Sequence, residues 1–187
     1  GIEGASVSTI ATGLQTGDNP RFIREHWGSP DTDEFKPLAK GGEDAWVVPS
    51  VTTKINWRDG GVEMQRIDSA RFQNPQHYGK EGLTWNQVKE TGRRFGFYPE
   101  GGIFDQTGSM VFPEDYLSPW KLMGVLNTDL YHALFLSLTP ERHWNPGDVA
   151  RIPWVFDQQD SRIAEVTKSQ YQEVISLRSS NPTSPYY

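Results

Sequence analysis

Glycine-flanked polar segments are the parts of this 187-residue sequence best suited to binding chemistry. GLQTGDNPRFIR at 13–24 ends in an Asp-Asn-Pro step and two arginines, and backbone N–H groups at such a helix start can hold an anion. YGKEGLTW at 78–85 joins a cation, an acid and an aromatic ring, a set able to contact a base edge or stack on a sugar. The plainer alternatives, a capped helix after a turn and a surface loop anchored by a Trp, remain open.

Two further segments carry charge beside glycine or aromatic residues. Lys40-Gly41-Gly42 is a flexible loop with one cation, and Arg93-Arg94 precedes an aromatic-rich stretch where it could meet phosphates. For both, solvated side chains are the ordinary interpretation. The order GxxxxGK[ST] of a nucleotide phosphate loop is absent.

No catalytic pattern accompanies these segments. The acidic pairs Glu43-Asp44 and Glu114-Asp115 lack the arrangement of a glycosidase, and there is no GxSxG nucleophile elbow. The four histidines are scattered without an HxxxH or HExxH pair, so no zinc site is expected. We therefore assign no catalytic residue and no metal ligand in this chain.

Charge and composition limit the possible partners. The formal charge is −6, but it is uneven: residues 36–100 carry 10 basic and 8 acidic side chains, net +2, whereas the segments on either side are each net −4. A polyanion would have to bind through this middle third, because phosphate contacts need Lys and Arg. The absence of cysteine, of a signal-peptide pattern and of a long apolar run predicts a cytoplasmic protein without a membrane partner.

Several elements can be predicted from local patterns. ASVSTIATGL at 5–14 indicates a strand, Asn19-Pro20 a helix start, and Asp59-Gly60-Gly61 a hairpin turn. Apolar residues at three- to four-residue spacing predict one helix over about 120–138.

The remaining elements complete an α+β assignment. Residues 148–156 are predicted as a strand, 158–178 as a second helix, and the aromatic–glycine alternation over 93–113 as strands joined by tight turns. Strands come mostly first and helices mostly late, which favours α+β over a doubly wound sheet. We expect one domain over 1–157 followed by a C-terminal helix and a Pro/Ser-rich tail over 158–187.

Six segments, taken in order, resemble the target recognition region of large adenine-specific DNA methyltransferases. The resemblance is to PglX-type enzymes of BREX phage-defence systems and to related single-chain restriction–modification enzymes, where the first segment reads GLxTGxNxxF and a later one IFDxxG. It covers roughly residues 11–157. The segments are GLQTGDNPRFIREHW, the Lys-Gly-Gly loop, YGKEGLTW, YPEGGIFDQTGSMVFP, LMGVLNTDLYHALFLSLTP and PGDVARIPW.

This resemblance implies a non-catalytic, sequence-specific recognition domain for double-stranded DNA, with a mixed sheet, packed helices and long loops. The adenine-N6 methyltransferase domain, a partner of this chain, would belong to a larger parent. S-adenosylmethionine would bind there, so no cofactor is expected in this chain. Other defence-system subunits are possible partners.

The resemblance also marks DNA-contact candidates, and shared residues would position the domain rather than specify a sequence. Specificity is expected mainly from 57–76 and 86–94. Together with Arg93 and Arg94, which were noted above for their charge, the candidates are Thr16, Asp18, Asn19, Arg21, Lys40, Gly41, Gly42, Lys80, Glu81, Thr84, Trp85, Gln106, Thr107 and Ser109.

Two other functions remain open. The acidic ends suit a protein-interaction domain that binds a defence-system partner or a phage inhibitor. Trp57, Trp85 and Trp144 with nearby acids would suit a carbohydrate-binding module if these rings were exposed.

Overall fold

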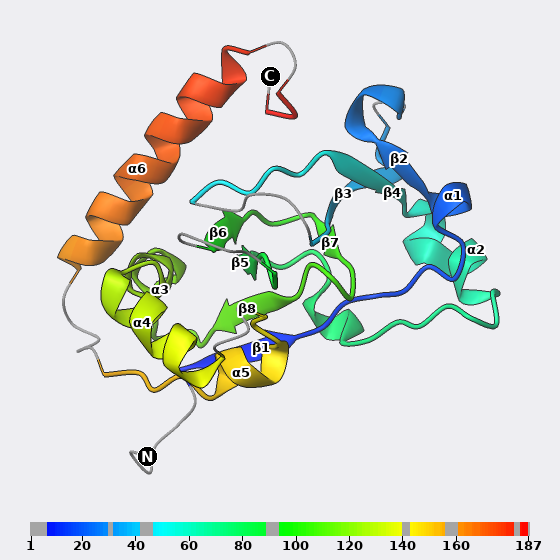
Figure 1. The fold of residues 1–187 in the computed structure, drawn as a ribbon. Coiled ribbons are helices and arrows are strands. Elements are labelled where there is room, and N and C mark those ends of the chain that lie inside the picture. Colours follow the sequence, from blue (N-terminus) through cyan, green and yellow to red (C-terminus); the bar gives the residue numbers. More distant parts are fainter. Residues whose placement is uncertain are drawn as a thin grey trace.

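The computed structural model describes residues 7–29, 32–41, 47–88, 94–139, 143–155, 161–181 and 184–186. Over these residues the chain has two four-stranded sheets with helices gathered mainly beside the first sheet (Figure 1). The predicted α+β class is therefore confirmed. Gly42 and Arg93 lie outside the described residues, as does residue 157, so the predicted domain boundary stays a prediction.

The first sheet is antiparallel and has the order β1-β8-β5-β6. All four residues of β5 and of β6 are buried, because helices and loops cover both faces of these strands. Their aromatic and glycine composition fits that position, since rings fill the core and glycine admits close backbone neighbours. The strands are β1 (Ser8–Ala11), β8 (Met110–Pro113), β5 (Gly82–Trp85) and β6 (Phe95–Tyr98).

The second sheet has the order β2-β4-β3-β7, with β7 parallel to β3. Its apolar side meets a core that includes Leu14, Phe22, Ile55 and Met64. Short helices flank this sheet. The elements are α1 (Asn19–Phe22), β2 (Ile23–Glu25), η1 (His26–Gly28), β3 (Phe35–Ala39), β4 (Thr53–Asn56), η2 (Arg58–Gly61), α2 (Val62–Gln65), η3 (Pro75–His77) and β7 (Ile103–Phe104).

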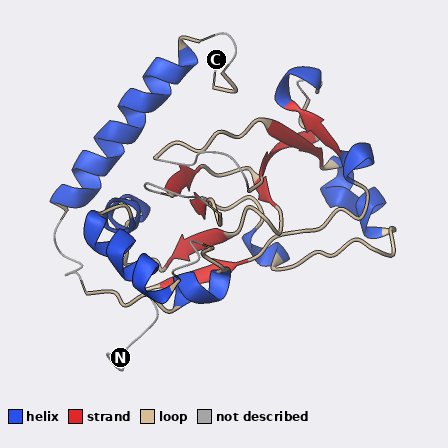
Figure 2. Cartoon of the chain, viewed as in Figure 1, coloured by secondary structure: helices blue, strands red, loops and turns tan. Residues whose placement is uncertain are grey.

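The longer helices build the other side of the molecule (Figure 2). α3 packs on the first sheet, and α6 packs along α3. In the core on this side, Trp144 stacks on Phe135 with ring centroids 4.0 Å apart, and the Trp85 indole N–H donates to the Trp144 carbonyl over 2.9 Å. The helices are α3 (Pro119–Leu126), α4 (Asp129–Leu138), α5 (Pro146–Ala150) and α6 (Arg162–Ser179), so the helix predicted over 158–178 is confirmed.

The helix predicted over 120–138 is instead two helices. The Asn127 side chain donates to the Phe95 carbonyl over 2.8 Å and accepts from the Phe95 N–H over 3.1 Å, which ties this position to β6. The next residue, Thr128, caps α4 by accepting from the Tyr131 N–H. Two residues whose side chains bond to backbone thus interrupt a continuous apolar periodicity.

Other local predictions were wrong or displaced. Asp59, Gly60 and Gly61 have positive φ, but they lead into α2 rather than into a returning strand. The strand predicted over 148–156 is replaced by α5, whose start carries a capping box between Asn145 and Asp148.

The beginning of the chain follows its prediction more closely. β1 is shorter than the strand predicted over 5–14, and α1 does start at Asn19. Asp18 caps this helix, because its carboxylate accepts from the Arg21 N–H over 3.2 Å. Among the described residues, no helix combines the length and apolar character needed to cross a membrane.

Candidate nucleic-acid interface

The segment 105–109, here called the DQTGS loop, brings together parts of the chain that are distant in sequence. Gly13 donates its N–H to the Asp105 carbonyl over 3.3 Å, and Asp105 donates its own N–H to the Ala39 carbonyl over 3.0 Å. The Gly41 N–H donates to the Thr107 hydroxyl over 3.0 Å. Three of the predicted segments, near residues 13–21, 40–41 and 105–109, therefore meet at one place.

Two glycines are needed for this junction by space alone. A Cβ on Gly13 would lie 1.9 Å from the Phe104 carbonyl oxygen, and a Cβ on Gly108 would lie 2.3 Å from the Ala39 carbonyl oxygen. These neighbours are backbone atoms, which cannot move aside without breaking the pairing. Gly13 and Gly108 therefore allow the backbone segments to approach one another, whether or not a ligand binds.

Asp105 fixes the shape of the loop. One of its carboxylate oxygens accepts from the Thr107 N–H and the Thr107 hydroxyl, each over 2.7 Å, and from the Gly108 N–H over 2.8 Å. Asp105 is 7% exposed, so these three bonds are made largely away from water. The loop is therefore preorganised, with the Gln106 and Thr107 side chains exposed on it.

The DQTGS loop and the first segment line an open concave surface, here called the polar hollow, of about 490 Å³. Its lining consists of residues 14–20 together with Ser69, Asp105 and Gln106. Buried Thr16 donates its hydroxyl to the Asn19 side chain over 2.5 Å and accepts from the Asp18 N–H over 3.1 Å. The candidates Asp18, Asn19 and Gln106 thus lie on one surface, and buried Thr16 holds the first two in place.

Lys80 and Glu81 lie elsewhere. They line a second open hollow of about 680 Å³, which also includes Glu100, Glu114 and Asp115. Four carboxylates make this surface unsuited to phosphate. His77 lines the same hollow, stacks on Phe112 at 4.4 Å, and has its pKa lowered by burial and then by the charge of Lys80.

Five candidates are buried, which corrects their predicted role as surface contacts. Ser109, Trp85, Arg94, Thr16 and Thr84 are 0%, 1%, 1%, 3% and 6% exposed. Thr84 donates its hydroxyl to the Ser109 carbonyl over 3.4 Å, which joins β5 to the DQTGS loop. Trp57 packs with Phe72 and Tyr78, and Trp144 is 1% exposed, so the three rings of a carbohydrate-binding surface are not available together.

Arg94 illustrates how a cation can serve the core. Its guanidinium carbon lies 3.7 Å from the ring centroid of Trp144, and Nη1 donates to the Gln87 carbonyl over 3.0 Å. A guanidinium stacks on an aromatic face through its planar, weakly hydrated surface. Arg94 therefore holds the 86–87 backbone against the aromatic core.

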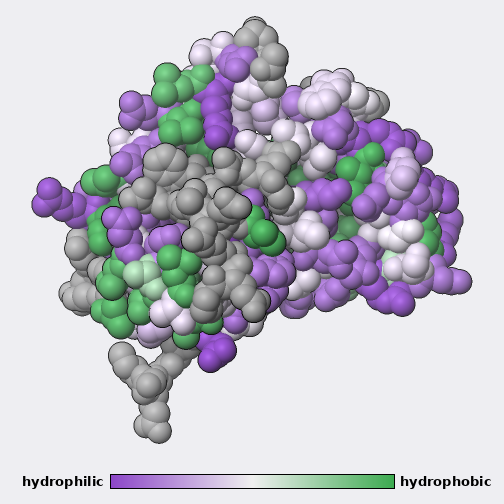
Figure 3. Space-filling model, viewed as in Figure 1, coloured by the Kyte–Doolittle hydropathy of each residue, from purple (hydrophilic) through white to green (hydrophobic). Residues whose placement is uncertain are grey.

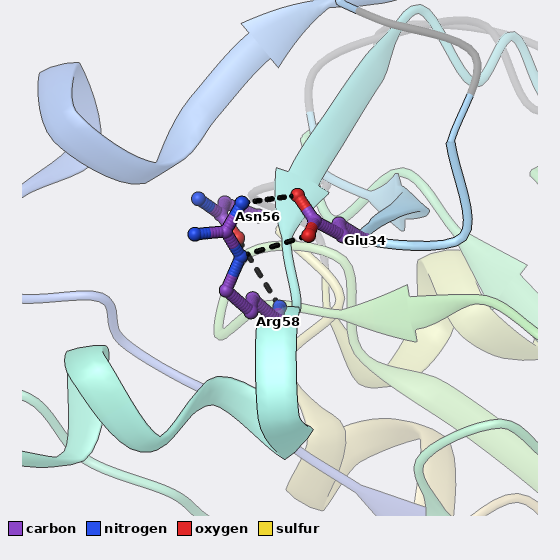
Figure 4. A network of polar contacts seen from close by, with 3 residues as sticks. All are labelled: Glu34, Asn56 and Arg58. Atoms are coloured by element: carbon purple, nitrogen blue, oxygen red, sulfur yellow. Dashed lines mark hydrogen bonds and ion pairs between the residues drawn. The ribbon is translucent and has the colours of Figure 1, made fainter.

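Exposed cations gather around the second sheet, although some are neutralised. Arg58 binds both oxygens of Glu34, over 2.9 and 2.7 Å, and its N–H donates to Asn56 over 3.1 Å (Figure 4). The Glu34 carboxyl has its pKa lowered, mainly by the Arg58 hydrogen bonds. Arg21 forms an ion pair with Glu63. Lys40 is exposed after β3.

A pair of cations stands on the outward face of the same sheet. Arg24 on β2 pairs in register with Lys54 on β4, while the neighbouring pair Ile23 and Ile55 faces the core. Directly paired residues of antiparallel strands point to the same face. Arg24 also donates from Nη1 to the carbonyl of Pro20, a residue lining the polar hollow, over 2.7 Å.

Arg71 is another cation beside the hollow. Its backbone exchanges hydrogen bonds of 2.8 and 2.9 Å with Gln15, so exposed Arg71 stands next to the lining of the hollow. Figure 3 shows that side chains over this part of the molecule, on the right of the view, are mostly hydrophilic. Gln15, Lys54 and Arg71 were missed among the sequence candidates, because only pairing between distant segments places them here.

Both hollows are open to solvent. No group of three or more His, Cys, Asp or Glu side chains among the described residues is arranged to hold a metal ion.

Comparison with known proteins finds two curated relatives and no matching family model. The chain is 29% identical over 143 residues to the adenine-specific methyltransferase BrxX of Escherichia coli O9:H4 (strain HS), an alignment that covers 73% of this chain and 12% of that protein. It is 25% identical over 186 residues to the adenine-specific methyltransferase PglX of Lacticaseibacillus casei (strain Zhang), covering 88% of this chain and 15% of that protein. The chain is thus related in sequence to BREX methyltransferases and spans about one seventh or less of their length.

Proposed function

We propose that this chain is the DNA target recognition domain of a BREX-type adenine-specific methyltransferase. It would bind double-stranded DNA and carry out no catalysis itself. The methyl transfer and S-adenosylmethionine binding would belong to another domain of the same gene product. The similarity to BrxX and PglX supports the relationship to methyltransferases.

The observation that carries the proposal is the convergence on the polar hollow. Residues 14–20 and the DQTGS loop form one preorganised surface with exposed amide and hydroxyl groups. Such groups match the donors and acceptors that base edges present in the major groove of DNA. Polar groups able to contact base edges therefore lie where two of the segments that resemble PglX-type methyltransferases meet.

The cations beside the hollow support the same proposal. Arg24 and Arg71 are hydrogen-bonded to residues that line it, and Lys54 is paired with Arg24. Backbone contacts from cations position a protein on DNA, while base contacts select the sequence. A net charge of −6 is compatible with this division, because the cations are local and act within about one Debye length of roughly 10 Å.

The proposal is tested by exchanging this region between relatives. In the whole gene product that carries this chain, residues 7–155 are replaced by the aligned region of the E. coli BrxX relative, and methylated adenines are mapped on genomic DNA. We expect the methylated sequence to become that of the BrxX donor. A hybrid that methylates the original sequence contradicts a recognition role for this chain.

A protein partner is the alternative function, and binding assays separate the two. Capture of DNA fragments by the whole gene product, lost when salt is raised from about 50 to 200 mM, is expected for phosphate-dependent binding. Capture of a protein that persists after nuclease treatment, with no retention of duplex DNA, supports the interaction domain instead.

A further inference from the structure

Two glutamine side chains meet across the polar hollow. The Gln15 amide Nε2 donates to Oε1 of Gln106, and both residues line the hollow. Their backbones are fixed independently of this bond: the Gln15 N–H donates to the Arg71 carbonyl over 2.8 Å, and the Gln106 N–H donates to the Leu14 carbonyl over 3.0 Å. The amide pair is therefore placed by a rigid backbone on both sides.

The fold itself makes little use of either side chain. Gln106 is exposed and Gln15 is half-buried, whereas their neighbours Thr16, Asp105 and Gly108 are buried and shape the backbone. A side chain that reads a variable sequence must be replaceable without loss of the fold. Gln15 and Gln106 meet that requirement.

The remaining hydrogen-bonding capacity of Gln106 has a definite pattern. Its Oε1 accepts one bond from Gln15, which leaves a second lone pair and both Nε2 protons for a ligand. A donor and an acceptor on one planar amide match N7 and the N6 amino group of adenine in the major groove. Guanine presents two acceptors at this edge and is a poorer match.

Gln15 improves this match by holding the Gln106 amide in place. A free glutamine loses rotamer freedom when it binds, and a side chain ordered in advance loses less. Arg71 and Arg24 lie close enough to the hollow to contact the phosphates that flank such a base. The arrangement combines an ordered side chain that can contact a base with cations nearby.

We propose that Gln106, held by Gln15, reads the major-groove edge of an adenine in the recognition sequence. This inference rests on the proposed function, because it needs the hollow to face duplex DNA. Gln106 is then a specificity residue, and Gln15 is a positioning residue that acts through it.

The test uses the whole gene product and two readouts: the methylated sequence in genomic DNA and competition binding with duplexes varied one base pair at a time. Gln106→Glu replaces the amide donors by acceptors, which disfavours adenine and favours the cytosine amino group. We expect preference at one base pair to shift by roughly 5- to 160-fold, the equivalent of one bidentate contact. Gln15→Ala should weaken discrimination at that same base pair without changing the preferred base.

Gln65→Glu is the matched control. Gln65 is an exposed glutamine on α2 whose amide donates to the Gly60 carbonyl, away from the hollow lining. The same change of charge there should leave the recognised sequence unaltered. If Gln106→Glu lowers the unfolding temperature, Gln106→Ala replaces it and should relax the preference at the same base pair.

The outcomes separate the inference from the proposed function. An unchanged sequence preference in folded Gln106 variants, with specific methylation retained, overturns the adenine-reading role and leaves DNA recognition standing. A wild-type protein that binds all duplexes equally removes the proposed function, and this inference with it. A shift of preference that also occurs in Gln65→Glu assigns the effect to charge alone and likewise overturns the inference.

Discussion

Arg24 and Lys54 stand directly opposite each other on β2 and β4, on the face of the sheet that points away from the core. Like charges in this position lower the stability of a sheet. Arg24 offsets part of this cost by donating to the Pro20 carbonyl over 2.7 Å. The pair is therefore a suitable place to measure protein stability and DNA affinity side by side.

We predict that Arg24→Ala combined with Lys54→Ala weakens DNA binding, with only a small change in the unfolding temperature. If both side chains contact phosphates, the slope of log affinity against log salt should fall by about 1.8, since each contact contributes about 0.9. Binding titrations at several salt concentrations and thermal unfolding measure the two effects. Lys168→Ala, an exposed lysine on α6 at the far side of the molecule (Figure 1), is the control and should change neither. An undiminished salt slope in the double variant excludes this face from the interface.

A second prediction concerns the glycines that let the DQTGS loop pack closely against neighbouring backbone. Gly13→Ala and Gly108→Ala should each lower the free energy of unfolding by about 1–3 kcal/mol or more, because the added methyl group meets a backbone carbonyl that cannot move freely. Urea denaturation with an unchanged m-value is the measurement. Gly28→Ala is the control, since a Cβ there meets no atom within 4 Å. Wild-type stability in Gly108→Ala would mean that the loop can shift away from Ala39 at no cost.

A third prediction distinguishes a core arginine from a DNA-binding one. Arg94→Lys keeps the charge but loses the planar group that lies over Trp144, so we expect a loss of stability of about 1–3 kcal/mol. The salt slope of DNA binding should be unaffected, because Arg94 is buried. Chemical denaturation and binding titrations on the same preparation test both statements. A reduced slope at full stability would instead return Arg94 to the group of phosphate contacts.

A fourth prediction follows from His77, whose pKa is lowered by burial and by Lys80. The unfolded chain therefore binds a proton at a higher pH than the folded chain does, and stability is lost as pH falls below about 6.5, the ordinary value for His. His77→Gln should flatten the dependence of stability on pH between about 6.5 and 5. Denaturation midpoints across this range provide the measurement. Superimposable pH profiles for variant and wild type would show that His77 titrates alike in both states.

Part of this fold could be predicted from local sequence. Asp18-Asn19-Pro20 does begin a helix, and the aromatic–glycine alternation after residue 93 does form strands, because capping, proline geometry and pleated packing act over a few residues. The position of the helix break at Asn127 could not be predicted, since its cause is a pair of hydrogen bonds to β6, 32 positions away.

The candidate site was predictable in its segments but not in its members. The sequence predicts contacts in both GLQTGDN and DQTGS, and the structure brings these segments together on the polar hollow. The residue types of Trp85 and Arg94 suit a core as well as a DNA surface, and both side chains are buried. The role of Gln15 has no local signal, because it depends on Gln106, 91 positions later. Pairing of this kind is a property of the whole chain and leaves no local pattern.

The long separation between the two glutamines has a consequence for synthesis of the protein. During translation at about 5–20 residues per second, the segment carrying Gln15 leaves the ribosome roughly 5–20 s before the segment carrying Gln106. β8, the only strand partner of β1 among the described residues, is synthesised after a similar delay. Until then a nascent strand remains exposed with open backbone groups, so we expect this region to be where chaperones engage the chain and where a truncated product would aggregate.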